Sequence, residues 1–257
     1  ENIGSIENLE AYSLRRWKRL GFSDAHIADA KAGFPKTGWK NLPLPAGESA
    51  VMARRHQLGI HPRFRMVDSC AAEFAATTPY YYSTYEGSDE SGVDILSDIE
   101  ERTKERMVVI GSGPIRIGQG IEFDYGCVHA VKAIRESGRD AIIINNNPET
   151  VSTDFDTSDR LYFEPLTLEC VCEVLIRERA HGILLQFGGQ TAINLALPLE
   201  SRLPNLEKMS LNLKILGTST DSIDEASDRE RFESFAERIG LKMPRGATGT
   251  TADDVRE

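Results

Sequence analysis

The chain has 257 residues, of which 40% are hydrophobic and 27% are charged, as is usual for a folded protein of one large or two modest domains. Its formal net charge of -10 argues against a general nucleic-acid or membrane surface, because either partner demands a basic face and the sequence holds no block of Lys and Arg. The apolar runs fall far short of the roughly 20 residues of a membrane span. We therefore expect a cytoplasmic protein that acts on small molecules and contacts neither nucleic acid nor membrane.

The N-terminal third is expected to be helical. Apolar residues at helical spacing over residues 8–30 predict two short helices, separated by a glycine stop and a cap at Ser23 in "GFSD". Prolines between residues 33 and 47 predict a surface loop, and another helix is expected near Ala50–Leu58. These elements predict a small all-helical segment over residues 1–85.

An aromatic segment and an acidic stretch come next. The aromatic segment contains Tyr80, Tyr81, Tyr82 and Tyr85, which could form a platform that stacks on bases. Because its surroundings are acidic, we favour an extended segment whose tyrosines lie against a neighbouring domain. The acidic, Gly/Ser-rich residues after it predict a linker over residues 86–105.

From residue 106 the pattern changes to short apolar strands that alternate with amphipathic helices. Strands are predicted at Met107–Ile110, Ala141–Ile144 and Leu161–Phe163, over "GILLQFGG" (182–189) and over "LKILGTS" (213–219). Helices are predicted over residues 123–138, over 168–179 after a cap at Thr167, and over 222–240 as one charged helix closed by Gly240. This order predicts an α/β, Rossmann-like domain over residues 106–240, with a parallel sheet flanked by helices.

Polar loops follow the predicted strands and should line one rim, since ligands of open parallel sheets bind beyond the carboxyl ends of the strands. Arg116 stands where a dinucleotide fingerprint needs a third small residue, and Asn145, not an acid, ends the second strand. Both features count against NAD. The rim is rich in Gly, Asn and Gln, with acid at Glu122 and Asp124, which suits a small polar molecule or its passage. Turn and cap chemistry alone is the alternative interpretation.

The cysteines predict neither disulfides nor a metal site. The chain has four of them, at Cys70, Cys127, Cys170 and Cys172. They are too few and too irregularly spaced for a disulfide framework, and no further Cys or His stands at ligand spacing. We expect buried or inert thiols.

Five motifs taken together resemble one family. In order and spacing, they closely resemble motifs of the large subunit of carbamoyl phosphate synthetase. The five motifs are "GPIRIGQGIEFDY", "NNNPETVSTDFDTSDRLYFEP", "QFGGQT", "GTSTDSID" and "DRERF". The resemblance extends upstream to "WKRLGFSD" and "HPRFRMVDSCAAEFAATTPYYYSTYE", and so covers nearly the whole chain. It implies a helical oligomerisation region over residues 1–85, a pre-ATP-grasp domain over 106–240 and the start of an ATP-grasp domain over 241–257. The start at Glu rather than Met and the unfinished helix pattern "TADDVRE" fit a piece of a longer chain.

The resemblance also implies an activity. The family makes carbamoyl phosphate from bicarbonate, glutamine-derived ammonia and two ATP with Mg or Mn, for arginine and pyrimidine biosynthesis. Its large subunit has two synthetase halves and a glutaminase small subunit as partner. The form of "NNNPETVSTDFDTSD" resembles the second half, which phosphorylates carbamate. The chain alone is expected to be inactive, with no catalytic residue and no fully bound cofactor, and to form a homo-oligomer, if at all, through its helical region.

Site residues follow from the motifs by the same resemblance. Arg229 in "DRERF" matches an arginine that contacts ATP phosphates, although a solvated helix face is the plain alternative. Gly120 and Glu122 match positions that line the tunnel for carbamate, with Arg116 and Gln119 as candidate tunnel or interface neighbours.

Three alternative functions remain. They are another ATP-grasp ligase such as a biotin carboxylase, an NAD-dependent oxidoreductase, and a non-catalytic interaction module. The Pro/Gly-rich stretch from Lys31 to Ser49 departs from the family, which usually has a more helical segment there.

Overall fold

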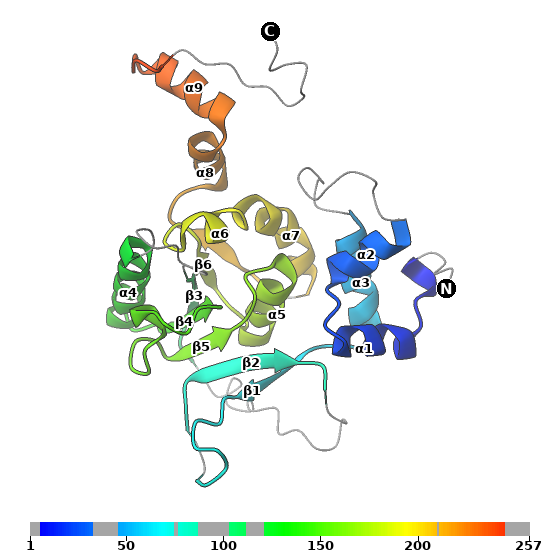
Figure 1. Ribbon diagram of the computed structural model, residues 1–257. Helices are drawn as coiled ribbons and strands as arrows, with labels where there is room; N and C mark the ends of the chain where they lie inside the picture. The colour runs from blue at the N-terminus through cyan, green and yellow to red at the C-terminus, as the bar shows by residue number, and fades with distance from the viewer. Residues whose placement is uncertain are drawn as a thin grey trace.

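The computed structural model describes residues 6–32, 46–74, 77–86, 103–111, 121–209 and 211–244 (Figure 1). In chain order, the N-terminal part contains η1 (Ile6–Asn8), α1 (Ala11–Arg19), α2 (Asp24–Ala32), α3 (Ala46–Gln57), β1 (Arg63–Met66) and β2 (Tyr80–Thr84). The rest contains β3 (Arg106–Ile110), α4 (Ile121–Glu136), β4 (Asp140–Asn145), η3 (Val151–Thr153), β5 (Arg160–Phe163), α5 (Leu168–Glu178), β6 (Gly182–Leu184), α6 (Gly189–Ile193), α7 (Ala196–Lys208), β7 (Lys214–Leu216), α8 (Thr220–Ser227) and α9 (Arg229–Arg238).

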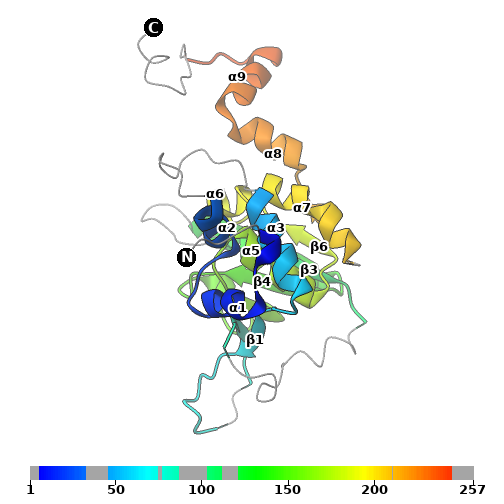
Figure 2. The same ribbon diagram turned by 90° about the vertical axis from the view of Figure 1, so that its right-hand side faces the viewer.

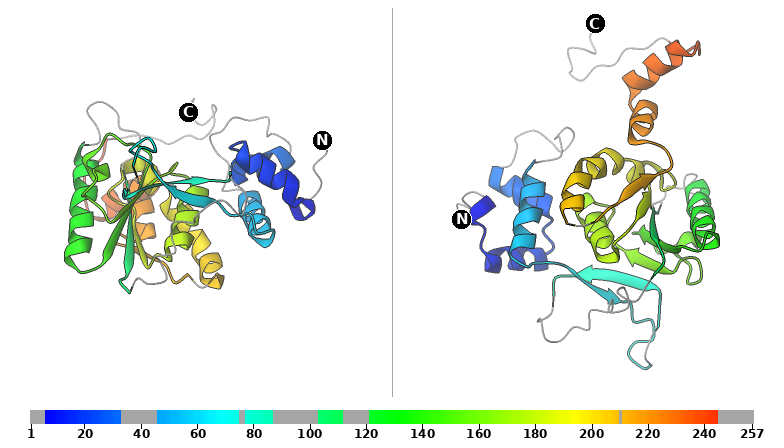
Figure 3. Two further views of the ribbon diagram at one scale, coloured as in Figure 1. Left: turned by 90° about the horizontal axis from the view of Figure 1, so that it is seen from below. Right: turned by 180° about the vertical axis from the view of Figure 1, so that it is seen from behind.

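The sheet has the order β1-β2-β5-β4-β3-β6-β7, and every neighbouring pair is parallel except β1 and β2. The chain runs outward from β3 through β4 to β5, and then returns to β6 and β7 on the other side of β3. Helices cover both faces, as Figures 1 and 3 show. The predicted α/β, Rossmann-like sheet is confirmed.

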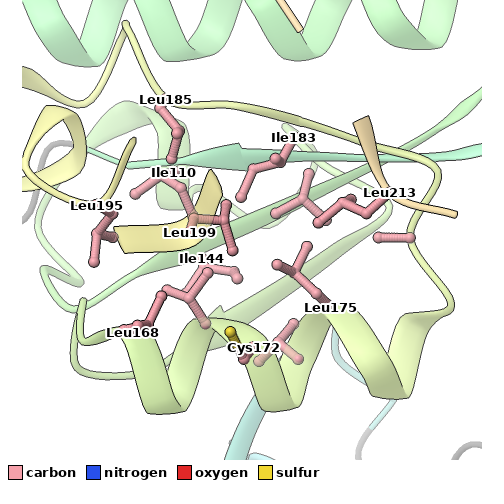
Figure 4. Close-up of a cluster of buried hydrophobic side chains, with 14 of the residues drawn as sticks. Ile110, Ile144, Leu168, Cys172, Leu175, Ile183, Leu185, Leu195, Leu199 and Leu213 are labelled. Carbon is pink, nitrogen blue, oxygen red and sulfur yellow. The ribbon is translucent and has the colours of Figure 1, made fainter. Parts of the chain in front are cut away.

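The two faces of the central strands have separate hydrophobic cores. Side chains of β3 and β4 that point to one face pack with α4, where Cys127 and Val131 are fully buried. Those on the other face pack with α5, α6 and α7, in the cluster drawn in Figure 4. All five residues of β3 are buried, because a central parallel strand is covered on both sides.

Local capping follows the sequence. Ser23 accepts a hydrogen bond from the backbone N–H of His26 at 3.1 Å, and Thr167 accepts one from the N–H of Cys170 at 3.3 Å. Gly138 follows α4 with a φ of +80°, a conformation that glycine adopts without strain. These predicted helix ends are confirmed.

Several elements differ from the prediction. Residues 1–85 are not all helical, because β1 and β2 form a hairpin that joins the sheet through β2 and β5. The predicted charged helix over residues 222–240 is two helices, since Asp228 ends α8 and caps α9 by accepting from the N–H of Arg231. Strands β6 and β7 are shorter than predicted, and α6 and α7 were not predicted.

The extended tyrosine segment is confirmed. Tyr80 and Tyr81 in β2 pair with Leu161 and Tyr162 in β5, and the ring of Tyr81 stacks on that of Tyr162 with centroids 5.5 Å apart. The predicted loop over 33–47 and the linker over 86–105 lie mostly outside the described residues, as does most of the predicted ATP-grasp start at 241–257.

A buried ionic network joins the N-terminal helices to the sheet domain. Arg55 in α3 lies 3.0 Å from Asp24 in α2 and 2.5 Å from Glu173 in α5. Lys18 in α1 pairs with Asp24 at 3.2 Å and also with Glu169 in α5. Burial alone would lower the pKa of Arg55, but the charges of Glu173 and Asp24 outweigh it and raise the pKa. Arg55 is therefore a permanent cation at this junction.

We expect Arg55→Met to destabilise the fold by about 3–5 kcal/mol, because it leaves the carboxylates of Asp24 and Glu173 buried without their main partner. Urea unfolding followed by circular dichroism measures this loss. The control is Arg16→Met on the exposed side of α1, which should cost less than about 0.5 kcal/mol. Equal stability of the two variants would contradict a structural role for the network.

Candidate functional site

The candidate site is the strand-end rim, which we define as Gly111, Asn145, Gln186, Gly188 and Gly217. Gly111 follows β3 and Asn145 ends β4, while Gln186 and Gly188 follow β6 and Gly217 follows β7. The strands β4, β3, β6 and β7 are neighbours in the sheet, so their ends lie side by side. The strand order reverses next to β3, which is where ligands of such sheets bind.

The rim is closely packed around two glycines. A Cβ on Gly111 would lie 2.5 Å from Cγ of Asn145, and a Cβ on Gly188 would lie 2.6 Å from the carbonyl oxygen of Ile110 and would also meet that of Gly111. Both approaches are too short for any side chain. The loops after β3, β4 and β6 can therefore touch only because glycine stands at these positions.

Neutral polar groups dominate the rim. Asn145 is fully buried, and its side-chain oxygen accepts from the backbone N–H of Asn147 at 3.2 Å. Oε1 of Gln186 is buried and has no hydrogen-bond partner within the described part of the chain. Amides of this kind can bind or pass a small polar molecule, because each offers both donors and an acceptor.

The first turn of α4 is locked to the loop after β4. Asp124 is buried and accepts from the backbone N–H groups of Val151, at 2.8 Å, and Ser152, at 3.1 Å. Thr150 and Thr153 form a capping box around the same short helix, η3. Asp124 thus has a structural role, and it fixes the position of Glu122, which is exposed in the same turn.

The rim contains no activated thiol. Sγ of Cys127 lies 3.6 Å from the carbonyl oxygen of Ile110 and 3.5 Å from that of Phe187, and donates to them. Burial raises the pKa of Cys127 to about 12, and the neighbouring charge of Asp124 adds to the effect. The thiol stays protonated at neutral pH and cannot act as a nucleophile there.

Arg229 lies on a different part of the molecule from the rim. It is exposed at the first position of α9, which packs against α8 and projects away from the sheet in Figures 1 and 2. The neighbouring Arg231 is held by Asp221, at 2.7 Å, and by Asp224. The contact of Arg229 with ATP phosphates stays a prediction.

Arg116, Gln119 and Gly120 lie outside the described residues, although Gly120 directly precedes α4. Their roles stay predictions. Of the predicted tunnel residues, the structure therefore positions Glu122.

One group of side chains away from the rim has the composition of a metal site. His56, His61 and Glu173 bring three potential ligand atoms within 4.8 Å of one another. However, Oε1 of Glu173 already lies 2.5 Å from Arg55 and 2.7 Å from Nε2 of His56. A dication would be repelled by Arg55, so the group works as part of the ionic network.

Comparison with known proteins identifies relatives. Residues 103–225 match the family described as carbamoyl phosphate synthase preATP-grasp domain. The chain is 49% identical to the carbamoyl phosphate synthase large chain of Methanothrix thermoacetophila over 95% of its length, and 48% identical to those of Methanosarcina mazei and Rubrobacter xylanophilus over 98%. It spans about a fifth of the length of these relatives, 20% or 21%.

Solved structures give weaker similarities. The biotin carboxylase domain of a single-chain bacterial carboxylase has a TM-score of 0.39 at 15% identity, and that of a thermophilic 2-oxoglutarate carboxylase bound to ADP has 0.37 at 18%. Each covers 59% of this chain and 32% of its own. Among the described helices, none combines the length and the apolar character that crossing a membrane requires.

We expect Asp124→Ala to cost about 1–3 kcal/mol, because the N–H groups of Val151 and Ser152 lose their buried acceptor. Amide hydrogen exchange should become faster at these two residues and stay unchanged in α5. Asp154→Ala, an exposed change in the same loop, is the matched control. Unchanged protection of Val151 and Ser152 in the Asp124 variant would show that the carboxylate does not hold this loop.

We expect the native chain to expose one reactive thiol at pH 8. Burial raises the pKa of Cys127, Cys170 and Cys172 to about 12, so they remain protonated. Cys70 is half-buried, as is Cys170, but it lies on a loop rather than in a helix. Titration with a chromogenic disulfide reagent should count one thiol in the native chain and all four in guanidinium. Cys70→Ser should abolish the native reaction. A fast reaction that persists in this variant would contradict the assignment.

Proposed function

We propose that this chain, a member of the family of carbamoyl phosphate synthase large chains, is the part of such a chain that opens the carbamate-phosphorylating half. The whole enzyme would be a glutamine-dependent, ATP-dependent carbon–nitrogen ligase. It would form carbamoyl phosphate from bicarbonate, ammonia from glutamine and two ATP, in the cytoplasm, for arginine and pyrimidine biosynthesis.

The observation that carries this proposal is the sequence identity of 48–49% with carbamoyl phosphate synthase large chains over 95–98% of the chain. The matched region includes the N-terminal helices, the hairpin and the sheet domain. An NAD-dependent oxidoreductase is less well supported, because Asn145 ends β4 where such enzymes use an acid to bind the ribose.

The proposed role of the rim is to pass carbamate rather than to react with it. Neutral amides at Asn145 and Gln186 can exchange hydrogen bonds with a small polar molecule without holding it tightly. Glu122 stands exposed on the first turn of α4, and the bonds of Asp124 keep that turn in place. We propose that Glu122 and Gly120 line the passage, with Arg116 and Gln119 as its neighbours, and that Glu122 orders water and the polar intermediate.

ATP would bind mainly outside this chain. Arg229 is the proposed contact with its phosphates, since a guanidinium can hold two phosphoryl oxygens at once. The remaining contacts and the Mg or Mn ions would come from an ATP-grasp domain. The chain alone should therefore form no carbamoyl phosphate.

The proposed partners are those of a large chain. They are a glutaminase small subunit, the other synthetase half, and a second copy of the large chain bound through the helical region. The relatives are named as large chains, in agreement with an enzyme of several subunits.

The test is Glu122→Gln in a full-length large chain that contains this segment. We expect glutamine-dependent carbamoyl phosphate formation to fall at least about tenfold, or ~1.4 kcal/mol, because the passage loses its carboxylate. Bicarbonate-dependent ATP hydrolysis, which precedes the passage, should stay within about twofold of wild type.

Glu136→Gln, an exposed change at the far end of α4, is the matched control and should affect neither rate. A parallel loss of both rates in the Glu122 variant would contradict a role in passage. The absence of any effect would do the same.

A further inference from the structure

Three aromatic rings form a patch at the outer strands of the sheet. Phe155, in the loop between β4 and β5, is 61% exposed. Its ring meets the ring of Tyr80 in β2 edge-on, with centroids 6.4 Å apart, and the centroid of the Tyr80 ring lies 5.4 Å from that of Phe163 in β5. A single exposed apolar side chain is ordinary, but a contiguous group of rings calls for an explanation. We define Phe155, Tyr80 and Phe163 as the aromatic patch.

The aromatic patch lies on the same face of the sheet as α4. Tyr80 and Phe163 pack at the margin of the core beneath α4, whereas their neighbours Tyr81 and Tyr162 point to the opposite face, because successive side chains of a strand alternate. Helix α4 itself packs on β3 and β4. The patch on β2 and β5 therefore continues that core outward to the surface of the molecule.

Two carboxylates flank the exposed ring. Asp154 and Asp156 directly precede and follow Phe155, and both are exposed. Within the described part of the chain, neither carboxylate has an ion pair or a hydrogen bond. Burial raises the pKa of Tyr80, and the charges of Asp154 and Asp156 raise it further, so both carboxylates lie near this ring as well. The patch thus combines an aromatic surface with two uncompensated negative charges.

The cations around the patch have other partners or stand apart from it. Arg135, in the last turn of α4, donates to the carbonyl oxygens of Asp156 and Thr157 at 2.8 and 2.9 Å, and its ion pair is with Asp159, at 3.8 Å. Arg65 lies in β1, one strand beyond the patch. Neither arginine forms an ion pair with the carboxylates that flank Phe155. A cation that approaches the patch therefore meets negative charge.

An arginine side chain fits this patch better than other groups. A guanidinium plane stacks on an aromatic ring, and its fork of donors matches carboxylate oxygens. Arginine and aromatic residues are also enriched at protein interfaces. Anions are repelled by Asp154 and Asp156. Because Phe155 is largely exposed, a free small cation would leave most of its ring in water, whereas an arginine on a protein surface brings neighbours that bury it.

We propose that the aromatic patch is an interface on which an arginine-bearing segment of the same large chain, from outside residues 1–257, docks with its guanidinium against Phe155 and between Asp154 and Asp156. The relatives supply the reason for this occupant, since the chain spans only 20% or 21% of their length. The inference rests on the proposed function in one respect, that the chain is part of a large chain. It does not depend on the passage of carbamate.

The docked segment would lie close to the first turn of α4. The loop that carries Phe155 begins at η3, and Asp124 in α4 accepts hydrogen bonds from the backbone N–H groups of Val151 and Ser152 in η3. At its other end, Arg135 holds the same loop to the last turn of α4. The loop is thus fixed along α4 at both ends, which gives the docking segment a preformed surface.

Hydroxyl-radical footprinting read by mass spectrometry tests the proposal, on the 257-residue chain and on a full-length large chain that contains it. We expect oxidation of Phe155 to be severalfold slower in the full-length chain, at every protein concentration, because the docked segment covers the ring. Equal oxidation in the two chains would overturn the proposal. Protection that also appears in the 257-residue chain and grows with its concentration would overturn it too, since the occupant would then be a second copy.

Charge reversal tests the role of the aspartates. Asp154→Lys combined with Asp156→Lys should raise the oxidation of Phe155 in the full-length chain to the level of the 257-residue chain. Glu136→Lys combined with Glu207→Lys, two exposed changes in α4 and α7, is the matched control and should leave Phe155 protected. Unchanged protection in the aspartate variant, or an equal loss in the control, would overturn the proposal.

Two further measurements make these outcomes specific. Thermal unfolding of the 257-residue chain with both aspartate changes should match wild type, which separates loss of docking from loss of the fold. A photo-crosslinking Phe155→p-benzoylphenylalanine variant of the full-length chain should label an arginine-bearing segment of the same polypeptide, and a crosslink to another protein instead would contradict the proposed occupant. Neither readout measures carbamoyl phosphate, so failure of the proposed activity would leave this result intact.

Discussion

Two glutamates on the inner side of α5 set a constraint that the rest of the structure satisfies. Glu169 and Glu173 are both buried, and a buried carboxylate is costly unless it is paired. Their partners, Lys18 and Arg55, come from helices more than a hundred residues earlier in the chain. Burial would raise the pKa of Glu173, but the hydrogen bond from His56 and the charge of Arg55 lower it. Each part of the molecule therefore supplies the charges that the other requires, and this favours folding as one unit.

In the sheet, too, structural and polar roles belong to different residues. Its two-sided core fixes the central strands, so the polar loops at their ends can be rich in glycine and amide without losing their place. Asp124 shows how this works, since an acidic side chain in a candidate site turns out to hold backbone groups of the next loop. The carboxylate of Asp124 is thereby occupied by backbone groups of the fold itself.

Much of this architecture could be predicted because it follows from local sequence patterns. Apolar runs gave the central strands, and Ser23, Thr167 and Gly138 gave helix ends. The hairpin was not predicted because its short strands contain charged or polar residues beside the apolar ones. It is stabilised by pairing with a distant strand, β5. Helix α7 was not predicted because it contains Pro198 and Pro204, and proline usually argues against a helix interior. The break at Asp228 was not predicted because a capping aspartate within a charged stretch cannot be told from the other charged residues of a helix. The rim was predicted as a group of loops, whereas the ionic network depends on contacts between distant residues that no local pattern contains.

The hairpin of β1 and β2 protects one edge of the sheet. Strand β2 covers β5, whose backbone would otherwise be open to pairing with another molecule, and β1 presents charged side chains such as Arg63 and Arg65 beyond it. The region that matches the preATP-grasp family, residues 103–225, contains neither strand. Cut at its conventional boundary, that region would have an unprotected sheet edge prone to aggregation. The sheet as it folds in this chain thus includes strands that lie outside residues 103–225.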